Sequence, residues 1–131
     1  MSIISVIAAA LACFAFGGIW YMTLARPWMA ASGITPGADG RPVGASPAPV
    51  LISLLAAVVV ATMMRHIFVA SGIETTGAGL VSGLGVGAFF IVPWMAMNNA
   101  YGMRPVRLTV IDGGYAILGC GIIGTVLALF L

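Results

Sequence analysis

The chain has 131 residues, of which 62% are hydrophobic and only 6% are charged, and all five basic residues are arginines. Soluble domains carry about 25% charged residues, so this composition excludes a water-soluble globular domain and indicates a protein surrounded by lipid. The arginines are dispersed along the chain and form no basic stripe, which also excludes a nucleic-acid-binding surface.

The first predicted element is an uncharged apolar run over residues 3–24. About 20 helical residues cross the hydrocarbon core of a bilayer, so this run is long enough to span it. No basic segment precedes the run, and it is longer than the apolar core of a signal peptide, so we interpret it as a retained transmembrane helix. One face of this helix carries a stripe of small residues with a tyrosine next in register: Ala9, Cys13, Gly17 and Tyr21.

The connection that follows, residues 25–49, is the only long one. It is rich in Gly and Pro, especially over residues 34–42 and 47–49. Residues of these types at this density predict turns and not helix. The connection is too short to form a domain, so we expect it to lie on the membrane surface.

The second predicted span covers residues 50–70 and is charged only near its end, at Arg65. A tight hairpin over residues 71–76 leads into the third span, residues 77–97, which is uncharged. Glu74 lies in this hairpin, and we expect it to pair with Arg65, whose long side chain can also reach the lipid headgroups.

Small residues recur at every fourth position in the third span and in the fourth span, residues 108–131. The third span carries Gly79, Gly83 and Gly87, and the fourth carries Ala116, Cys120 and Gly124. Such residues let membrane helices approach closely. The two stripes therefore predict helix-packing faces, which either seal the four helices together or bind a second copy of the chain. Pro93 is expected to kink the third span near its end.

The four spans predict an all-α integral membrane four-helix bundle, with residues 1–131 forming a single transmembrane domain. An even number of spans places both termini on one side. The first and third connections carry four arginines: Arg26, Arg41, Arg104 and Arg107. The opposite side carries only Arg65. Cytoplasmic loops carry an excess of arginine and lysine. We therefore expect the protein in a bacterial inner (cytoplasmic) membrane, with both termini in the periplasm.

Asp112 is the one carboxylate that falls clearly inside a predicted span, one to two turns from the start of the fourth. A carboxylate at that depth is energetically expensive and usually paired. Arg107 is poorly placed on the same helix face, so Arg26 or Arg104 is the expected partner. Two interpretations remain open, a salt bridge that locks the loops and a site for a proton or cation.

Two distinctive motifs resemble those of the small bacterial membrane proteins of domain-of-unknown-function family 1761. The first motif is Gly17-Gly18-Ile19-Trp20-Tyr21, followed by Pro27-Trp28-Met29 and Gly33. The second is Asn98-Asn99-Ala100-Tyr101 and Arg104-Pro105, then Leu108 and Ile111-Asp112-Gly113-Gly114-Tyr115. The chain departs from the family in lacking lysine in its first connection and in a Pro/Gly-rich insertion after Gly33.

The resemblance implies a four-helix membrane protein and brings no established activity. It also singles out a set of candidate site residues near the predicted cytoplasmic end. Together with Arg104, these residues form our candidate polar cluster: Trp20, Tyr21, Asn98, Asn99 and Asp112.

The sequence contains no nucleophile–base pair, phosphate-binding loop or cluster of metal ligands, so we expect neither catalysis nor a metal site. No cofactor can be named. The favoured interpretation is a non-catalytic accessory or packing subunit of a homo-oligomer or of a larger membrane complex. The alternative is a small oligomeric transporter or channel that uses Asp112 and the nearby polar residues. The expected partners are the lipid bilayer and other copies or other membrane subunits, with no nucleic acid.

Overall fold

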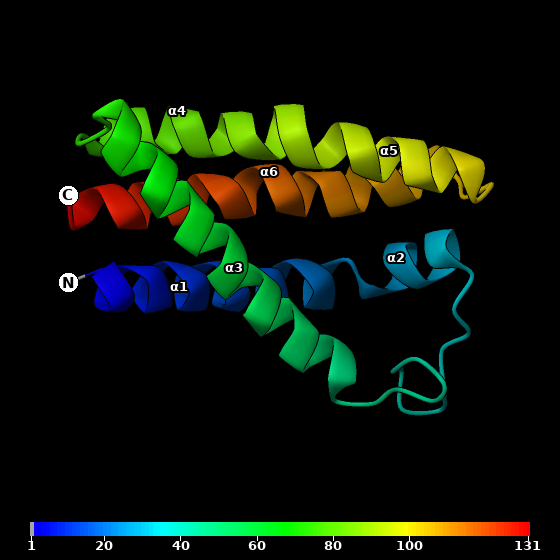
Figure 1. Cartoon of the computed structure of the whole chain (residues 1–131). Coiled ribbons are helices and arrows are strands. Elements are labelled where there is room, and N and C mark those ends of the chain that lie inside the picture. Colours follow the sequence, from blue (N-terminus) through cyan, green and yellow to red (C-terminus); the bar gives the residue numbers. More distant parts are fainter. Residues whose placement is uncertain (1) are drawn as a thin grey trace.

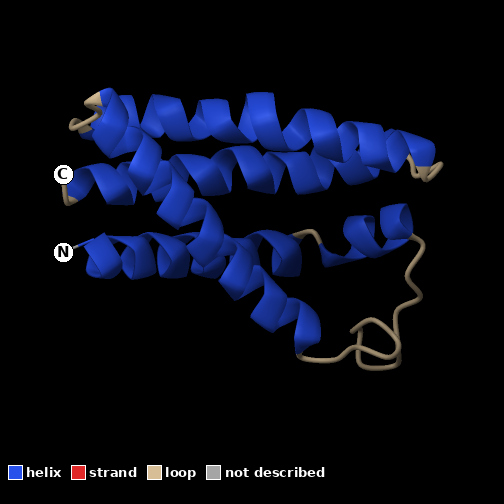
Figure 2. Cartoon of the chain, viewed as in Figure 1, coloured by secondary structure: helices blue, strands red, loops and turns tan. Residues whose placement is uncertain are grey.

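The computed structural model of the chain describes residues 2–131, which form helices and irregular connections without any strand (Figure 2). Four helical stretches in this part of the chain are long and apolar enough to cross a membrane: Ile3–Thr23, Ala48–Ser71, Thr76–Tyr101 and Val106–Leu129. The predicted all-α membrane fold with four spans is therefore confirmed.

Helix α1 (Ser2–Thr23) is the first span, and it is followed directly by a short helix, α2 (Ala25–Ser32). The chain bends at Leu24, where φ is −104° and ψ is 20°. Helix α2 ends at Gly33, whose φ of +76° is a left-handed conformation that glycine adopts without strain. The prediction that residues 25–49 form only turns is therefore wrong for the first third of the connection, because the Pro/Gly-rich stretch begins only after Gly33.

Helix α3 (Ala48–Ser71) is the second span and crosses the other helices diagonally (Figure 1). A proline in its first turn lacks the N–H that would have no partner there in any case. The helix ends at Gly72, whose φ is +71° and whose N–H bonds back to the carbonyls of Phe68 and Val69. This helix contacts α1, and its small residues Ala57 and Ala61 are buried.

The third span is interrupted and consists of α4 (Thr76–Val86), a five-residue π-helix η1 (Gly87–Ile91) and α5 (Val92–Tyr101). The wider turn is visible in the bond from the Val92 N–H to the Gly87 carbonyl. Pro93 explains the interruption, because it has no N–H to donate and its ring clashes with the carbonyl four residues earlier. The disturbance expected at Pro93 thus takes the form of a π-helix placed just before it.

Helix α6 (Val106–Leu129) is the fourth span and the centre of the bundle (Figure 1). It contacts α1 on one side and α4, η1 and α5 on the other. In its most apolar stretch 39% of the residues are buried, more than in any other span. The core lies where α6 meets α1 and α3, and its largest buried side chains are Met64, Phe68, Ile123 and Leu127.

The two predicted small-residue stripes face each other along the α4–α6 seam, within a single copy of the chain. A Cβ added at Gly79 would meet the carbonyl oxygen of Gly124, and one added at Gly83 would meet the carbonyl oxygen of Cys120. A Cβ added at Gly87 would lie 2.6 Å from the carbonyl oxygen of Ala116. Of the two possibilities left open by the sequence, sealing of the four helices is therefore the one that the structure realises.

Candidate functional site

Asp112 lies on the second turn of α6 and is half-buried. Its Oδ1 atom accepts two hydrogen bonds, from the Tyr21 hydroxyl at 2.6 Å and from the Trp28 indole N–H at 3.1 Å. The prediction of a salt bridge to Arg26 or Arg104 is wrong, because no ion pair to this carboxylate forms within residues 2–131. Two neutral aromatic donors, from the last turn of α1 and from α2, hold the carboxylate instead.

Close contact between α1 and α6 brings these donors to Asp112. The Trp20 indole N–H donates to the main-chain oxygen of Ile111 at 3.0 Å, one residue before the carboxylate. The Trp20 ring lies over Gly114, where an added Cβ would be 2.8 Å from a ring carbon. Glycine at position 114 thus leaves room for Trp20. The contact of Trp20 with α6 fixes the position along this helix at which the next residue, Tyr21, meets it.

Edge-to-face ring contacts hold Tyr21 in place from two sides. Its ring centroid is 6.0 Å from that of Trp28, with an interplanar angle of 80°, and 5.4 Å from that of Tyr115, with an angle of 72°. This geometry is favourable because the positive edge of one ring meets the negative face of the other. The hydroxyl of Tyr21 is therefore directed at Asp112 by packing, and the carboxylate meets a preformed donor.

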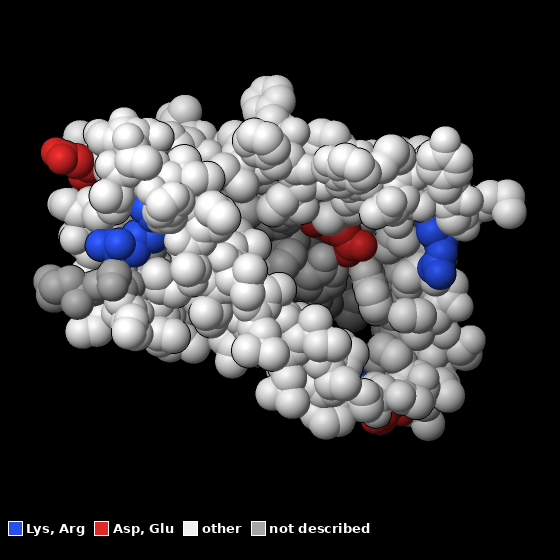
Figure 3. All heavy atoms as spheres, in the orientation of Figure 1, with Lys and Arg blue, Asp and Glu red and all other residues white. Residues whose placement is uncertain are grey.

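A pocket of about 520 Å³ opens beside the carboxylate, between α2, α5 and the start of α6. Figure 3 shows a hollow on this face of the molecule with acidic atoms at its wall. The pocket is lined by Trp28, Ser32, Ile34, Asn98, Asn99, Gly102, Arg104, Leu108 and Asp112. It is the more polar of the two hollows described here.

Arg104 and the two asparagines also line this pocket. Arg104 donates from Nη1 to the main-chain oxygen of Ser32, in the last turn of α2. Asn99 donates from Nδ2 to the Thr109 hydroxyl at 3.0 Å, and Asn98 is exposed in the same lining. Arg104 therefore ties the α5–α6 connection to α2.

The structure divides the candidate polar cluster into two groups. Asp112, Asn98, Asn99 and Arg104 line the pocket together. Trp20 and Tyr21 lie outside the lining and support the carboxylate from α1. Sequence reasoning missed Trp28 as a partner of Asp112, although it stands in the first of the two distinctive motifs.

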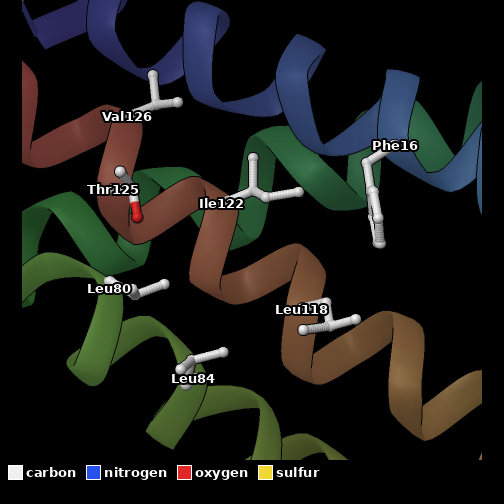
Figure 4. Close-up of a pocket in the computed structure, with 7 residues that line it drawn as sticks. All are labelled: Phe16, Leu80, Leu84, Leu118, Ile122, Thr125 and Val126. Carbon is white, nitrogen blue, oxygen red and sulfur yellow. The ribbon is translucent and has the colours of Figure 1, made fainter.

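The second hollow is an apolar groove of about 310 Å³ between α1, α4 and α6. Figure 4 shows Phe16 from α1 and the leucines of α4 converging on one face of α6. The only polar side chain in its lining is Thr125, whose hydroxyl donates to the main-chain oxygen of Gly121 at 2.9 Å. No group in this groove is left to select a polar ligand, so the candidate site is the pocket at Asp112.

At the opposite end of the bundle, the expected pair of Arg65 and Glu74 does not form within residues 2–131, and the buried Nε of Arg65 has no hydrogen-bond partner. Glu74 is exposed in the turn between α3 and α4. The described residues also contain no group of three His, Cys, Asp or Glu side chains that could hold a metal ion.

A family model described as "Protein of unknown function (DUF1761)" matches residues 4–128. No curated protein and no solved structure matches the chain.

Proposed function

Because this chain belongs to the DUF1761 family, whose function is unknown, we propose its role from the geometry of its own pocket: a small, non-catalytic membrane transporter that binds a cationic molecule at Asp112. The proposal takes up the alternative raised by the sequence, and one observation carries it. Asp112 lines a pocket of about 520 Å³, and no cationic side chain within residues 2–131 pairs with it.

A carboxylate near the membrane interior needs compensation for its charge. Tyr21 and Trp28 supply two hydrogen bonds but no positive charge. A structural latch would be expected to pair the carboxylate with one of the arginines, and Arg104 instead bonds to the main-chain oxygen of Ser32. The negative charge at Asp112 is thus left for a cation that enters the pocket.

The interrupted third span supports transport and not simple binding. Short π-helices occur frequently at functional sites, and transporters use discontinuous helices next to their substrate sites. Here η1 separates α4, which is held tightly to α6 by the glycine seam, from α5, which carries Asn98 and Asn99 of the pocket wall. We propose that α5 moves about η1 and so opens and closes the pocket.

Equilibrium binding of ethanolamine, a small primary ammonium ion, to the purified full chain in detergent tests the proposal. We expect saturable binding that weakens at least about tenfold in Asp112→Asn, because a charge-assisted contact contributes about 1.5–3 kcal/mol. Asp39→Asn, in the exposed long connection, is the matched control and should bind as the wild type does. Equal affinity in the two variants would show that Asp112 does not form the site.

Transport itself is tested in proteoliposomes by exchange of labelled ethanolamine across the bilayer. We expect exchange with the wild type and with Asp39→Asn, and a rate close to that of empty liposomes with Asp112→Asn. Binding without exchange would limit the role to binding and would contradict the transporter proposal.

The second candidate function is the accessory subunit of a homo-oligomer or larger membrane complex. The observation that favours it is the outer face of α3, where Leu51, Ile52 and Leu55 are at least 60% exposed within one copy. The glycine stripe gives this candidate no support, because it is used within the chain. The mass of the complex after gentle solubilisation separates the two, since a fixed assembly with other subunits favours the accessory role.

For the location we propose a bacterial inner membrane with both termini in the periplasm. The start of α1 and the end of α6 lie at one end of the bundle, and the long connection after α2 lies at the other (Figure 1). Cys13 and Cys120 are buried, so a cysteine introduced as Asp39→Cys can be labelled selectively. An impermeant maleimide should label it in inverted vesicles and not in intact spheroplasts, and the reverse pattern would contradict this orientation.

A further inference from the structure

The geometry points to a zwitterion as the molecule that the pocket binds, with its ammonium group at Asp112 and its anionic oxygens, phosphate or carboxylate, at Arg104. This inference rests on the proposed function and extends it from a cation to a molecule with two opposite charges. It follows from two charged side chains that line one pocket without pairing with each other.

Helix α2 holds the two charges apart. The Trp28 indole N–H donates to Asp112, and the main-chain oxygen of Ser32 accepts from Arg104. These two α2 residues are four positions apart, about 6 Å along a helix at 1.5 Å per residue. The positive and the negative side chain are therefore held by successive turns of one helix and line the same pocket.

The Asp112 end suits an ammonium group. Both of its hydrogen bonds within the described chain go to Oδ1, so Oδ2 has no donor there. The indole of Trp28 lines the pocket beside it. A carboxylate next to an aromatic ring is a combination that attracts an ammonium ion, through charge and through the negative face of the ring.

The Arg104 end suits an oxyanion. A guanidinium has five N–H donors in a planar fork, and within the described residues only Nη1 donates, to the Ser32 carbonyl. The side chain is exposed on the pocket wall beside Asn98, so the remaining donors face accessible space. Planar donors in this arrangement match phosphate and carboxylate groups.

A ligand with one charge would neutralise one side chain and leave the other unpaired, whereas a zwitterion neutralises both. Two sources supply this chemistry: a phosphatidylethanolamine headgroup that reaches the pocket from the bilayer, and a free zwitterion from water. Both place an ammonium group and an oxyanion on one short linker, and the experiment separates them.

Titration calorimetry on the purified full chain tests the inference with three probes: glycerophosphoethanolamine, which carries both charges, ethanolamine, which carries only the ammonium group, and glycerol phosphate, which carries only the anion. We expect the whole molecule to bind at least about tenfold more tightly than either half. Arg104→Gln should reduce its affinity to that of ethanolamine and leave ethanolamine binding unchanged. Asp112→Asn should reduce it to that of glycerol phosphate, while Arg107→Gln and Asp39→Asn should change nothing.

The outcomes distinguish this inference from the proposal on which it rests. If ethanolamine binds through Asp112 as tightly as the whole molecule does, and Arg104→Gln has no effect, the zwitterion is refuted and the cation site stands. If none of the three probes binds, both are refuted. Should Asp112→Asn fail to fold, the three probes on the wild type and the exposed Arg104→Gln variant still decide the question.

Native mass spectrometry of the extracted wild type identifies the source. Retained phosphatidylethanolamine that is lost in Arg104→Gln and kept in Arg107→Gln supports the lipid headgroup. No retained lipid, together with tight binding of glycerophosphoethanolamine, supports the free zwitterion.

Discussion

Replacing Gly83 by alanine tests one of the closest approaches between α4 and α6. The added methyl group would meet the Cys120 carbonyl oxygen, and it would lie 2.9 Å from the carbonyl carbon of Cys120 and 3.0 Å from the Cα of Gly121. All three atoms belong to the backbone of α6, so no side chain can turn away. Ordinary contact begins at 3.4 Å, so the Cys120 carbonyl carbon must recede by about 0.5 Å and its nearer oxygen by more.

A gap of about 0.5 Å already forfeits about a quarter of the dispersion attraction between the atoms that face each other. Small-to-large changes in packed interiors typically cost about 1–3 kcal/mol. Alanine also favours helix by up to about 1 kcal/mol over glycine, which partly offsets this loss. Gly85→Ala gives the matched control, because it lies in the same helix and its added Cβ meets nothing within 4 Å.

The assay is reversible unfolding in mixed detergent micelles, followed by tryptophan fluorescence. We expect Gly83→Ala to be less stable than Gly85→Ala by about 1–3 kcal/mol, with Gly85→Ala equal to the wild type or slightly more stable. Equal stability of the two variants would refute the assignment of the glycine stripe to the α4–α6 seam.

The other predictions concern the aromatic support of the carboxylate and use the same unfolding assay. Tyr21→Phe removes a hydrogen bond to the Asp112 carboxylate and should lower the free energy of unfolding by about 1.5–3 kcal/mol. Tyr101→Phe, at an exposed tyrosine, is the control and should have no effect. An equal loss of stability in both variants would contradict the assigned bond. Trp20→Phe removes the donor to the Ile111 carbonyl and should lower the free energy of unfolding by about 1 kcal/mol. It should also weaken ethanolamine binding, because Trp20 fixes the position of its neighbour Tyr21 along α6. Unchanged binding would show that Trp20 supports only the fold.

The sequence predicted the spans and the two packing faces, because both depend on patterns that repeat along one helix, but it left open which surface each face meets. A continuous apolar run of about 20 residues leaves few alternatives to a transmembrane helix. Glycines at every fourth position define one face, and the small residues of α6, Cys120 and Gly124 among them, form the face that fits it.

The partners of Asp112 were not predictable in the same way, because they depend on where α2 lies. Counting charges suggested an arginine, but helix α2 brings Trp28 to the carboxylate and places the Ser32 carbonyl where Arg104 can bond to it. The position of the short helix α2 after the bend at Leu24 is set by its tertiary contacts with α6. Local composition could not reveal it, since the same connection contains a Pro/Gly-rich stretch.

The central position of α6 has a consequence for biosynthesis. This helix follows the other three spans in the chain, so the ribosome delivers it after them. Until it enters the bilayer, the glycine face of α4 has no backbone to pack against, and Tyr21 has no carboxylate to bond. Helices α1 and α3 can already pack against each other at that stage, whereas the α4–α6 seam and the pocket form only when α6 inserts.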